Sequence, residues 1–182
     1  MSELVRWLVP AAATAFASPA CLAVQYMTAE QARALMFPDA REFAPAPIKL
    51  TKEQVRAIEE LTGLRVRVPD QAVWQVRADD RPLGWFIVDE VFGKHELITY
   101  AVALNADGSV RQIEVLDYRE SYGYEIRNPA WRRQFVGKRH GDLLKLDADI
   151  RNISGATLSC RHIADGVRRL LALHQVALKP YL

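Results

Sequence analysis

The chain has 182 residues, of which half are apolar and one quarter are charged, and its formal net charge is +2. This length and composition predict one globular domain with a substantial core, together with an extension. The near-neutral charge gives no indication of a nucleic-acid partner, and the absence of any Cys-x-x-Cys pair excludes c-type haem attachment and iron–sulfur ligation by this chain.

Residues 1–23 have the features of a secretory signal peptide. Arg6 precedes an uncharged stretch rich in alanine, and small residues up to Ala23 can be read by a signal peptidase. The stretch is too short and too rich in alanine for a typical membrane span. We therefore expect a periplasmic protein that begins after Ala23. An ordinary N-terminal helix and a lipid anchor on Cys21 are the alternatives.

Residues 24–70 are predicted to form an N-terminal helical segment with a linker. Thr28 is positioned to cap a first short helix. Two prolines within residues 44–47 then indicate a stiff, extended linker. Thr51 and Gln54 form a capping box, in which each side chain bonds the backbone of the other, so a second helix is expected to begin there.

From residue 71 onward, four stretches rich in β-branched and aromatic residues predict strands. These strands are expected at residues 72–76, 84–91, 97–104 and 110–116. Asparagine, aspartate and glycine within residues 105–108 predict a hairpin turn between the last two. With helices before and after the strands, the expected fold is α+β: a single domain with a twisted, mainly antiparallel sheet flanked by helices.

Two further helices are expected after the strands. Asn128 and Pro129 form an N-cap and first-turn pair for a helix over residues 128–137, with Trp131 facing the core. Residues 154–159 then place two small residues and three hydroxyls at the start of a helix with apolar residues at helical spacing. Because helix N-termini bind anions, this start is a candidate phosphate site. A Ser-capped surface helix is the alternative.

The string Ser154-Gly155-Ala156-Thr157-Leu158-Ser159 resembles the flavinylation motif of the FMN-binding domain family. This family includes the covalent-flavin subunits of sodium-pumping NADH:quinone oxidoreductases and Rnf-type complexes. A second segment, Glu120-Ser121-Tyr122-Gly123-Tyr124-Glu125, is similar to the Glu-Thr-Pro-Gly-x-Gly segment of the family. Trp131 and Phe135-Val136-Gly137-Lys138 resemble the helix that follows it, and the likeness runs over residues 82–173.

The resemblance implies that residues 71–182 are an FMN-binding domain with FMN esterified through its phosphate to Thr157. It further implies that neighbouring residues hold the phosphate and its tether, and that the upstream segment flanks the flavin ring. The first set is Ser154, Gly155, Ala156, Leu158 and Ser159; the second is Glu120, Ser121, Tyr122 and Gly123.

The chain departs from the family pattern at three positions. The family usually carries Asp three residues before the Ser/Thr of the motif, where this chain has Arg151, with Asp149 two residues further upstream. Tyr122 stands where proline is common and Glu125 where glycine is common. An aromatic side chain at 122 can still stack on a flavin ring.

Other groups of residues are weaker candidates for a site. Glu120 and Glu125 form an acid/base pair if their loop curls, with solvated or capping carboxylates as the alternative. Gly93 lies in a turn at residues 93–96 and can approach a ligand, with a plain hairpin loop as the alternative. Cys160 is expected to be a small residue on a helix face rather than a nucleophile. Histidine and cysteine spacings do not indicate a metal site.

The sequence thus predicts an exported electron-transfer protein that carries FMN, relays electrons to or from a membrane-bound reductase or respiratory complex, and is modified by a flavin transferase if the flavin is covalent. No nucleic-acid or metal partner is expected. A non-redox sensor or assembly subunit that binds flavin or another phosphorylated ligand is the alternative. A self-contained flavin reductase would need a hydride-donor site, and no Gly-x-Gly-x-x-Gly fingerprint of a nicotinamide cofactor is present.

Overall fold

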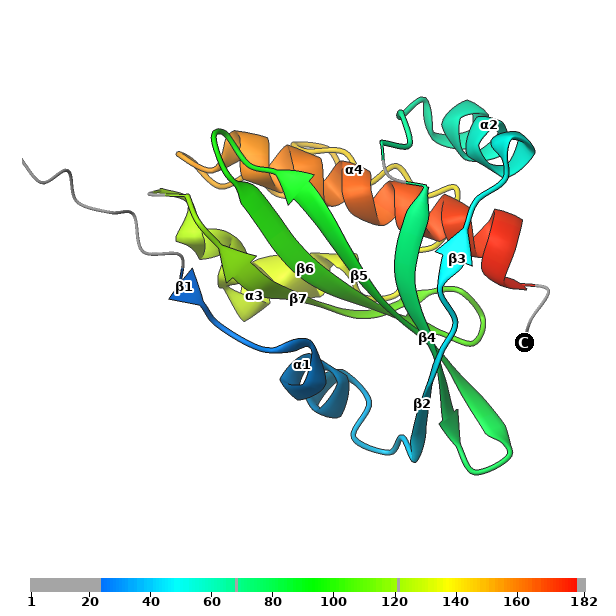
Figure 1. Cartoon of the computed structure of the whole chain (residues 1–182). Helices are drawn as coiled ribbons and strands as arrows, with labels where there is room; N and C mark the ends of the chain where they lie inside the picture. Colours follow the sequence, from blue (N-terminus) through cyan, green and yellow to red (C-terminus); the bar gives the residue numbers. More distant parts are fainter. Residues whose placement is uncertain (1–23, 68, 121, 180–182) are drawn as a thin grey trace, which may run out of the picture.

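An antiparallel sheet with the strand order β1-β7-β6-β5-β4-β2 organises the chain in the computed structural model, which describes residues 24–67, 69–120 and 122–179 (Figure 1). Four long strands follow one another as neighbours in this sheet and confirm the four predicted strands, each of them longer than expected. They are β4 (Asp70–Ala78), β5 (Arg81–Phe92), β6 (Leu97–Asn105) and β7 (Val110–Tyr118). The predicted α+β class, with a mainly antiparallel sheet and flanking helices, is confirmed.

Three short strands from the N-terminal part of the chain join the edges of this sheet. β1 (Val24–Gln25) pairs with β7, whereas β2 (Glu42–Pro45) and β3 (Ile48–Lys49) pair with β4. The chain is extended at residues 44–47, as predicted for the linker, and Ala44 and Pro45 in addition pair with β4 as part of β2. Pro45 has no N–H to donate, and an edge strand tolerates such a residue because one side of it needs no partner.

The two N-terminal helices begin where their caps predict. α1 (Ala29–Met36) is capped by Thr28, and α2 (Lys52–Thr62) begins with the capping box of Thr51 and Gln54. In α2 the Gln54 N–H donates to Thr51 Oγ1 (3.2 Å), and the Thr51 N–H donates to Gln54 Oε1 (3.0 Å). Both contacts lie within four consecutive residues, which is why the sequence reveals them.

The C-terminal helices are α3 (Pro129–Arg132) and α4 (Thr157–Leu173), and α4 continues as one π-helical turn at His174–Leu178. Asn128 caps α3 as predicted, but its α-helical part spans only Pro129–Arg132, and a 3-10 turn at Arg133–Phe135 completes the expected helix. Within the described ranges, no helix has both the length and the apolar character needed to cross a bilayer.

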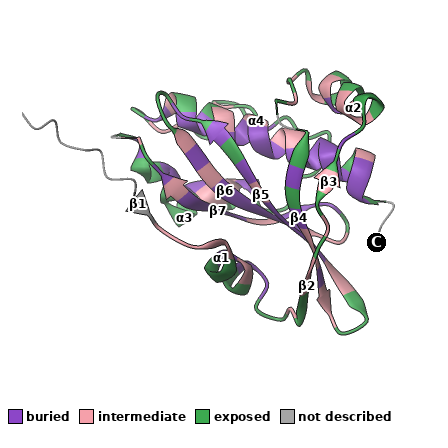
Figure 2. Ribbon diagram, viewed as in Figure 1, coloured by how far each residue is buried: buried purple, intermediate pink, exposed green. Residues whose placement is uncertain are grey.

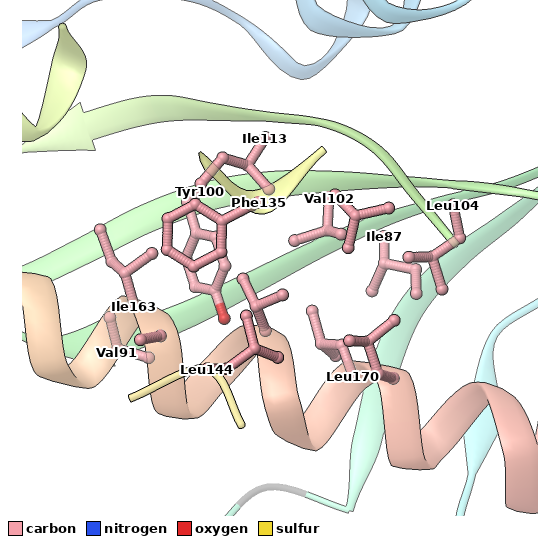
Figure 3. Packing of buried hydrophobic residues seen from close by; sticks show 14 of the residues in the cluster. Ile87, Val91, Tyr100, Val102, Leu104, Ile113, Phe135, Leu144, Ile163 and Leu170 are labelled. Carbon is pink, nitrogen blue, oxygen red and sulfur yellow. The ribbon is translucent and has the colours of Figure 1, made fainter. Parts of the chain in front are cut away.

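Helices cover both faces of the sheet, and two apolar layers result (Figures 1 and 2). α1 buries Ala32 and Met36 against one face. α4 lies along the other face, where its Ile163 and Leu170 join Val91, Tyr100 and Val102 of β5 and β6 (Figure 3). The apolar spacing that predicted this helix therefore forms its buried side.

A buried polar cluster fixes the position of α4 on the sheet. The Tyr100 hydroxyl donates to Asp89 (2.5 Å), and Asp89 also pairs with Arg169 of α4 (2.5 Å). Burial, together with the neighbouring Asp89 charge, raises the pKa of Tyr100 well above its usual value, so the hydroxyl remains a donor. A Cβ on Gly166 would collide with this hydroxyl, so glycine is needed for α4 to pack this closely.

Candidate functional site

The two segments that the sequence analysis singled out lie against each other, next to the end of β7. Gly123 contacts Ala156: a Cβ added to Gly123 would lie 2.9 Å from the Ala156 Cβ and 2.6 Å from the Tyr118 hydroxyl oxygen. Gly123 also has a φ of +90°, which side-chain-bearing residues rarely adopt. A glycine is therefore required for the upstream loop to reach the start of α4.

Tyr118, the last residue of β7, connects the same two segments through its hydroxyl. The hydroxyl donates to the backbone carbonyl of Tyr122 and lies 3.4 Å from Ser159 Oγ. Burial is the largest cause of a raised pKa for this phenol, so it stays protonated at neutral pH. The predicted site residue between Glu120 and Tyr122, Ser121, lies outside the described residues.

Thr157 is the first residue of α4 and is partly exposed. Its hydroxyl accepts a hydrogen bond from Asn152 Nδ2 (3.1 Å). The N-cap position is held by Ala156, and no side chain caps this helix, so the alternative of a Ser-capped surface helix is wrong. The N–H groups of the first turn are therefore left without the side-chain acceptor that most helices provide.

The rest of the motif divides into an exposed and a buried part. Ser154 and Gly155 are exposed, and the position of a Cβ on Gly155 would have open space around it. Leu158 is 39% exposed, whereas Ser159 is only 4% exposed. The hydroxyls that a reagent can reach are consequently those of Thr157 and Ser154, and the Ser159 hydroxyl faces inward.

Asp149 is engaged within the fold. Its carboxylate accepts hydrogen bonds from Lys138 Nζ (2.8 Å) and from the backbone N–H groups of Leu144 (3.1 Å) and Lys145 (2.7 Å). Burial alone would raise the pKa of Asp149, but these donors outweigh it and lower the pKa. Asp149 thus holds the loop that precedes the motif and is poorly placed to replace the acid that the family carries at position 151.

The backbone of Arg151 is bound by the helix that precedes it. Trp131 Nε1 donates to the Arg151 carbonyl (2.7 Å), and the Arg151 N–H donates to Gln134 Oε1 (2.8 Å). Trp131 is 5% exposed and packs edge-on against Phe135, with ring centroids 5.2 Å apart, so it belongs to the core as predicted. The Arg151 residue itself is exposed. Residues 131–134 therefore set the path of the chain into the motif.

The Glu120 carboxylate faces the turn between β5 and β6. Its Oε1 accepts the backbone N–H groups of Lys94, His95 (2.5 Å) and Glu96 (3.0 Å). Burial would raise the pKa of Glu120, but these three donors outweigh it and the pKa is lowered. The ionised Glu120 carboxylate therefore contributes its full stabilisation of the folded protein above the ordinary pKa of 4.5. This contribution is lost as the pH falls through the lowered pKa.

Two exposed aromatic side chains, Tyr122 and Tyr124, lie in the upstream segment next to Gly123. Tyr122 is 81% exposed and Tyr124 is 62% exposed, although both are large and partly apolar. Tyr122 is the residue that replaces the usual proline of the family. These rings are available to a ligand or a partner at the surface.

Two hollows of the described surface lie away from this region. One of about 350 Å³ lies beside α1, and another of about 250 Å³ lies between β7 and α3. Neither is lined by residues of the two motif segments. Their principal lining residues are Arg33, Phe37 and Phe43 for the first, and Arg111, Arg132 and Arg133 for the second.

Cys160 is fully buried on α4 and unpaired. Burial raises the pKa of its thiol to about 11, so almost none of it is thiolate at neutral pH. This confirms the interpretation of Cys160 as a small residue on a helix face. Across the described residues, no group of three or more His, Cys, Asp or Glu side chains is arranged to hold a metal ion.

Residues 93–172 match the FMN-binding domain family, and this range contains both motif segments and the turn held by Glu120. The chain therefore contains an FMN-binding domain, and FMN is its cofactor. The match confirms the family that the sequence motifs indicated.

Two relatives are similar to this chain. Over 114 residues the chain is 33% identical to the C subunit of the Na(+)-translocating NADH-quinone reductase of Yersinia pestis, and the match covers 60% of this chain and 42% of that protein. The chain thus spans less than half the length of this relative. It is also similar to the crystal structure of Shewanella oneidensis NqrC, with a TM-score of 0.49 and 17% identity over 76% of this chain and 70% of that one.

Proposed function

We propose that this protein is an exported electron carrier in which FMN is joined by a phosphoester to Thr157. The observation that carries the proposal is the uncapped start of α4: a reachable hydroxyl at Thr157 stands beside first-turn N–H groups that have no side-chain acceptor. Such N–H groups and the positive end of the helix dipole stabilise a phosphate. This start lies inside the range that matches the FMN-binding family.

The residues around Thr157 suit the attachment of a phosphate. Gly155 leaves open space for phosphate oxygens, and the exposed Ser154 offers a further donor. Asn152 donates a hydrogen bond to the Thr157 hydroxyl oxygen and orients it. A buried Ser159 and a buried Cys160 offer no competing nucleophile.

The bound FMN supplies one- and two-electron chemistry, and the protein supplies placement and electrostatics. Tyr122 and Tyr124 are large exposed rings next to the motif and suit contact with an aromatic ligand. The proposed partner is a membrane-bound reductase or respiratory complex, because the relative from Yersinia pestis is named as part of a quinone reductase. A flavin transferase is the partner that attaches the cofactor.

Export is part of this proposal, and it rests on residues 1–23, which lie outside the described residues. If they are a signal peptide, the exported protein should begin near Val24. N-terminal sequencing of protein recovered from the periplasm tests this. A full-length product that begins at Met1 and stays in the cytoplasm would overturn both the localisation and the respiratory role.

We expect Arg151→Asp to maintain or raise the fraction of protein that carries covalent flavin. The change restores the acid that the family places here, and only the Arg151 backbone is used by Trp131 and Gln134. A guanidinium near a phosphate also stabilises its charge, so the flavin should become more mobile in the variant. Intact-mass spectra and flavin fluorescence anisotropy measure the two effects. If neither changes, Arg151 has no part in the site.

Absorbance of the purified protein before and after acid precipitation tests the proposed function. Covalent FMN colours the pellet, and FMN bound without a bond colours the supernatant. A colourless protein would contradict the proposal and favour the non-redox sensor or assembly subunit, for which the missing acid at 151 would mark the loss of flavinylation.

A further inference from the structure

Residues 92–96 comprise the last residue of β5 and the turn that leads into β6, and hydrogen bonds both within the turn and from a distant side chain hold them. The Gly93 N–H donates to the Glu96 carbonyl (2.7 Å) and closes the turn. The next three N–H groups all point to one oxygen of Glu120, which is 24 to 26 residues away in the sequence. A Cβ on Gly93 would collide with this carboxylate, so the carboxylate needs a glycine there.

The same turn is fastened from its other side to α4. The Phe92 carbonyl accepts a hydrogen bond from His162 Nδ1 (2.5 Å). His162 lies four residues after Leu158, so both side chains share one face of the helix. Residues 92–96 are thus tied both to the loop that continues into Tyr122 and Gly123 and to the helix that begins with Thr157.

Residues 92–96 expose side chains that can contact a flavin. Lys94 and His95 are exposed, and Phe92 is 53% exposed despite its large apolar ring. His95 is close enough to Glu120 to contribute to the lowering of its pKa. Cations beside a flavin favour the negative charge that it gains on reduction, and an exposed ring offers a contact for an aromatic ligand.

We propose that residues 92–96 are a third segment of the flavin site and that Glu120 is the positioning residue that holds them there. This inference rests on the proposed function, since it names a further part of the same site. Glu120 acts through the backbone of the turn. Its Oε1 accepts the N–H groups of residues 94–96, and the contact of Glu120 with the flavin ring stays a prediction.

Protein loaded with FMN by a flavin transferase allows the test, with Glu120→Ala compared against Glu90→Ala. Glu90 is an exposed glutamate of β5 that accepts a hydrogen bond from the Thr99 hydroxyl and lies outside residues 92–96. Both variants remove one carboxylate, but only Glu120 accepts the three N–H groups. We expect the amides of residues 94–96 to exchange about tenfold faster or more in Glu120→Ala, as measured by NMR. The visible circular dichroism of the flavin and its quenching by iodide should change as well. Glu90→Ala should leave the amide exchange, the circular dichroism and the iodide quenching close to those of the parent.

Two results of this comparison would overturn the inference alone. Unchanged exchange in Glu120→Ala would show that Glu120 does not hold the turn. Faster exchange with flavin signals equal to those of Glu90→Ala would show that Glu120 holds the turn but that the turn lies outside the flavin site. A parent chain that takes up no FMN is a different result, seen before the variants are compared, and it would overturn the proposed function together with this inference.

Discussion

Replacing Thr157 with alanine is expected to abolish covalently bound flavin and to leave the fold intact. Only a side-chain hydroxyl can form the phosphoester, and Thr157 is partly exposed at a helix start, where the one hydrogen bond described for its hydroxyl comes from Asn152. The change should lower the free energy of unfolding by no more than about 1 kcal/mol. Flavin absorbance in the acid-precipitated pellet, after co-expression with a flavin transferase, measures the loss.

Thr157→Ser is the matched control, because it keeps the hydroxyl and should keep the pellet coloured. A coloured pellet from Thr157→Ala would move the attachment to Ser154 or Ser159. Of these two, the exposed Ser154 would be favoured, since Ser159 is 4% exposed and faces Tyr118.

Replacing Trp131 with alanine is expected to have the largest effect on stability, a loss of about 3 to 5 kcal/mol in the free energy of unfolding. The indole is buried against Phe135 and donates to the Arg151 carbonyl, so the change leaves a cavity and an unpaired backbone group. Urea unfolding measures it. Because this residue holds the chain that leads into the motif, flavinylation should also fall.

Trp131→Phe separates the contribution of ring packing from that of the hydrogen bond to the Arg151 carbonyl. It also keeps the prediction testable if the alanine variant does not fold. The phenyl ring retains much of the packing but not the N–H, so a loss of about 1 to 2 kcal/mol is expected. A loss below about 1 kcal/mol in Trp131→Ala would show that the indole does not anchor this part of the chain.

The sequence predicts those parts of the fold that depend on neighbouring residues. The capping box of Thr51 and Gln54, the turn that ends at Gly108 and the Asn128 cap are each complete within a few residues. The spacing of Ile163, Val167 and Leu170 identifies the buried face of α4 for the same reason. Such contacts need no knowledge of the rest of the chain.

Pairings between distant segments were missed. β2 pairs Ala44 with Gln75 and Pro45 with Trp74, and no residue type near Pro45 indicates an edge strand.

The helix over residues 128–137 was predicted as one element, but it tightens to a 3-10 turn at Arg133–Phe135. The predicted boundary between residues 24–70 and 71–182 stays a prediction, although strands from both segments share the sheet.

The sequence located two parts of the site but not the contacts that join them. The resemblance to the family motifs identified the segments around Gly123 and Thr157, and the structure places these segments next to each other. The bond of Glu120 to residues 94–96 joins segments far apart in the chain, so spacing could not reveal it. The glycine at position 93 was the one available signal, because it marks a close approach whose partner the sequence leaves open.

Fragment mass spectrometry of the flavin-bearing peptide from the exported protein tests the proposed phosphoester most directly. We expect fragment ions that place the FMN phosphoester on the side chain of Thr157. A flavin found on Ser154 or Ser159, or a peptide that spans residues 154–159 and carries no flavin while the transferase modifies a known substrate, would contradict it.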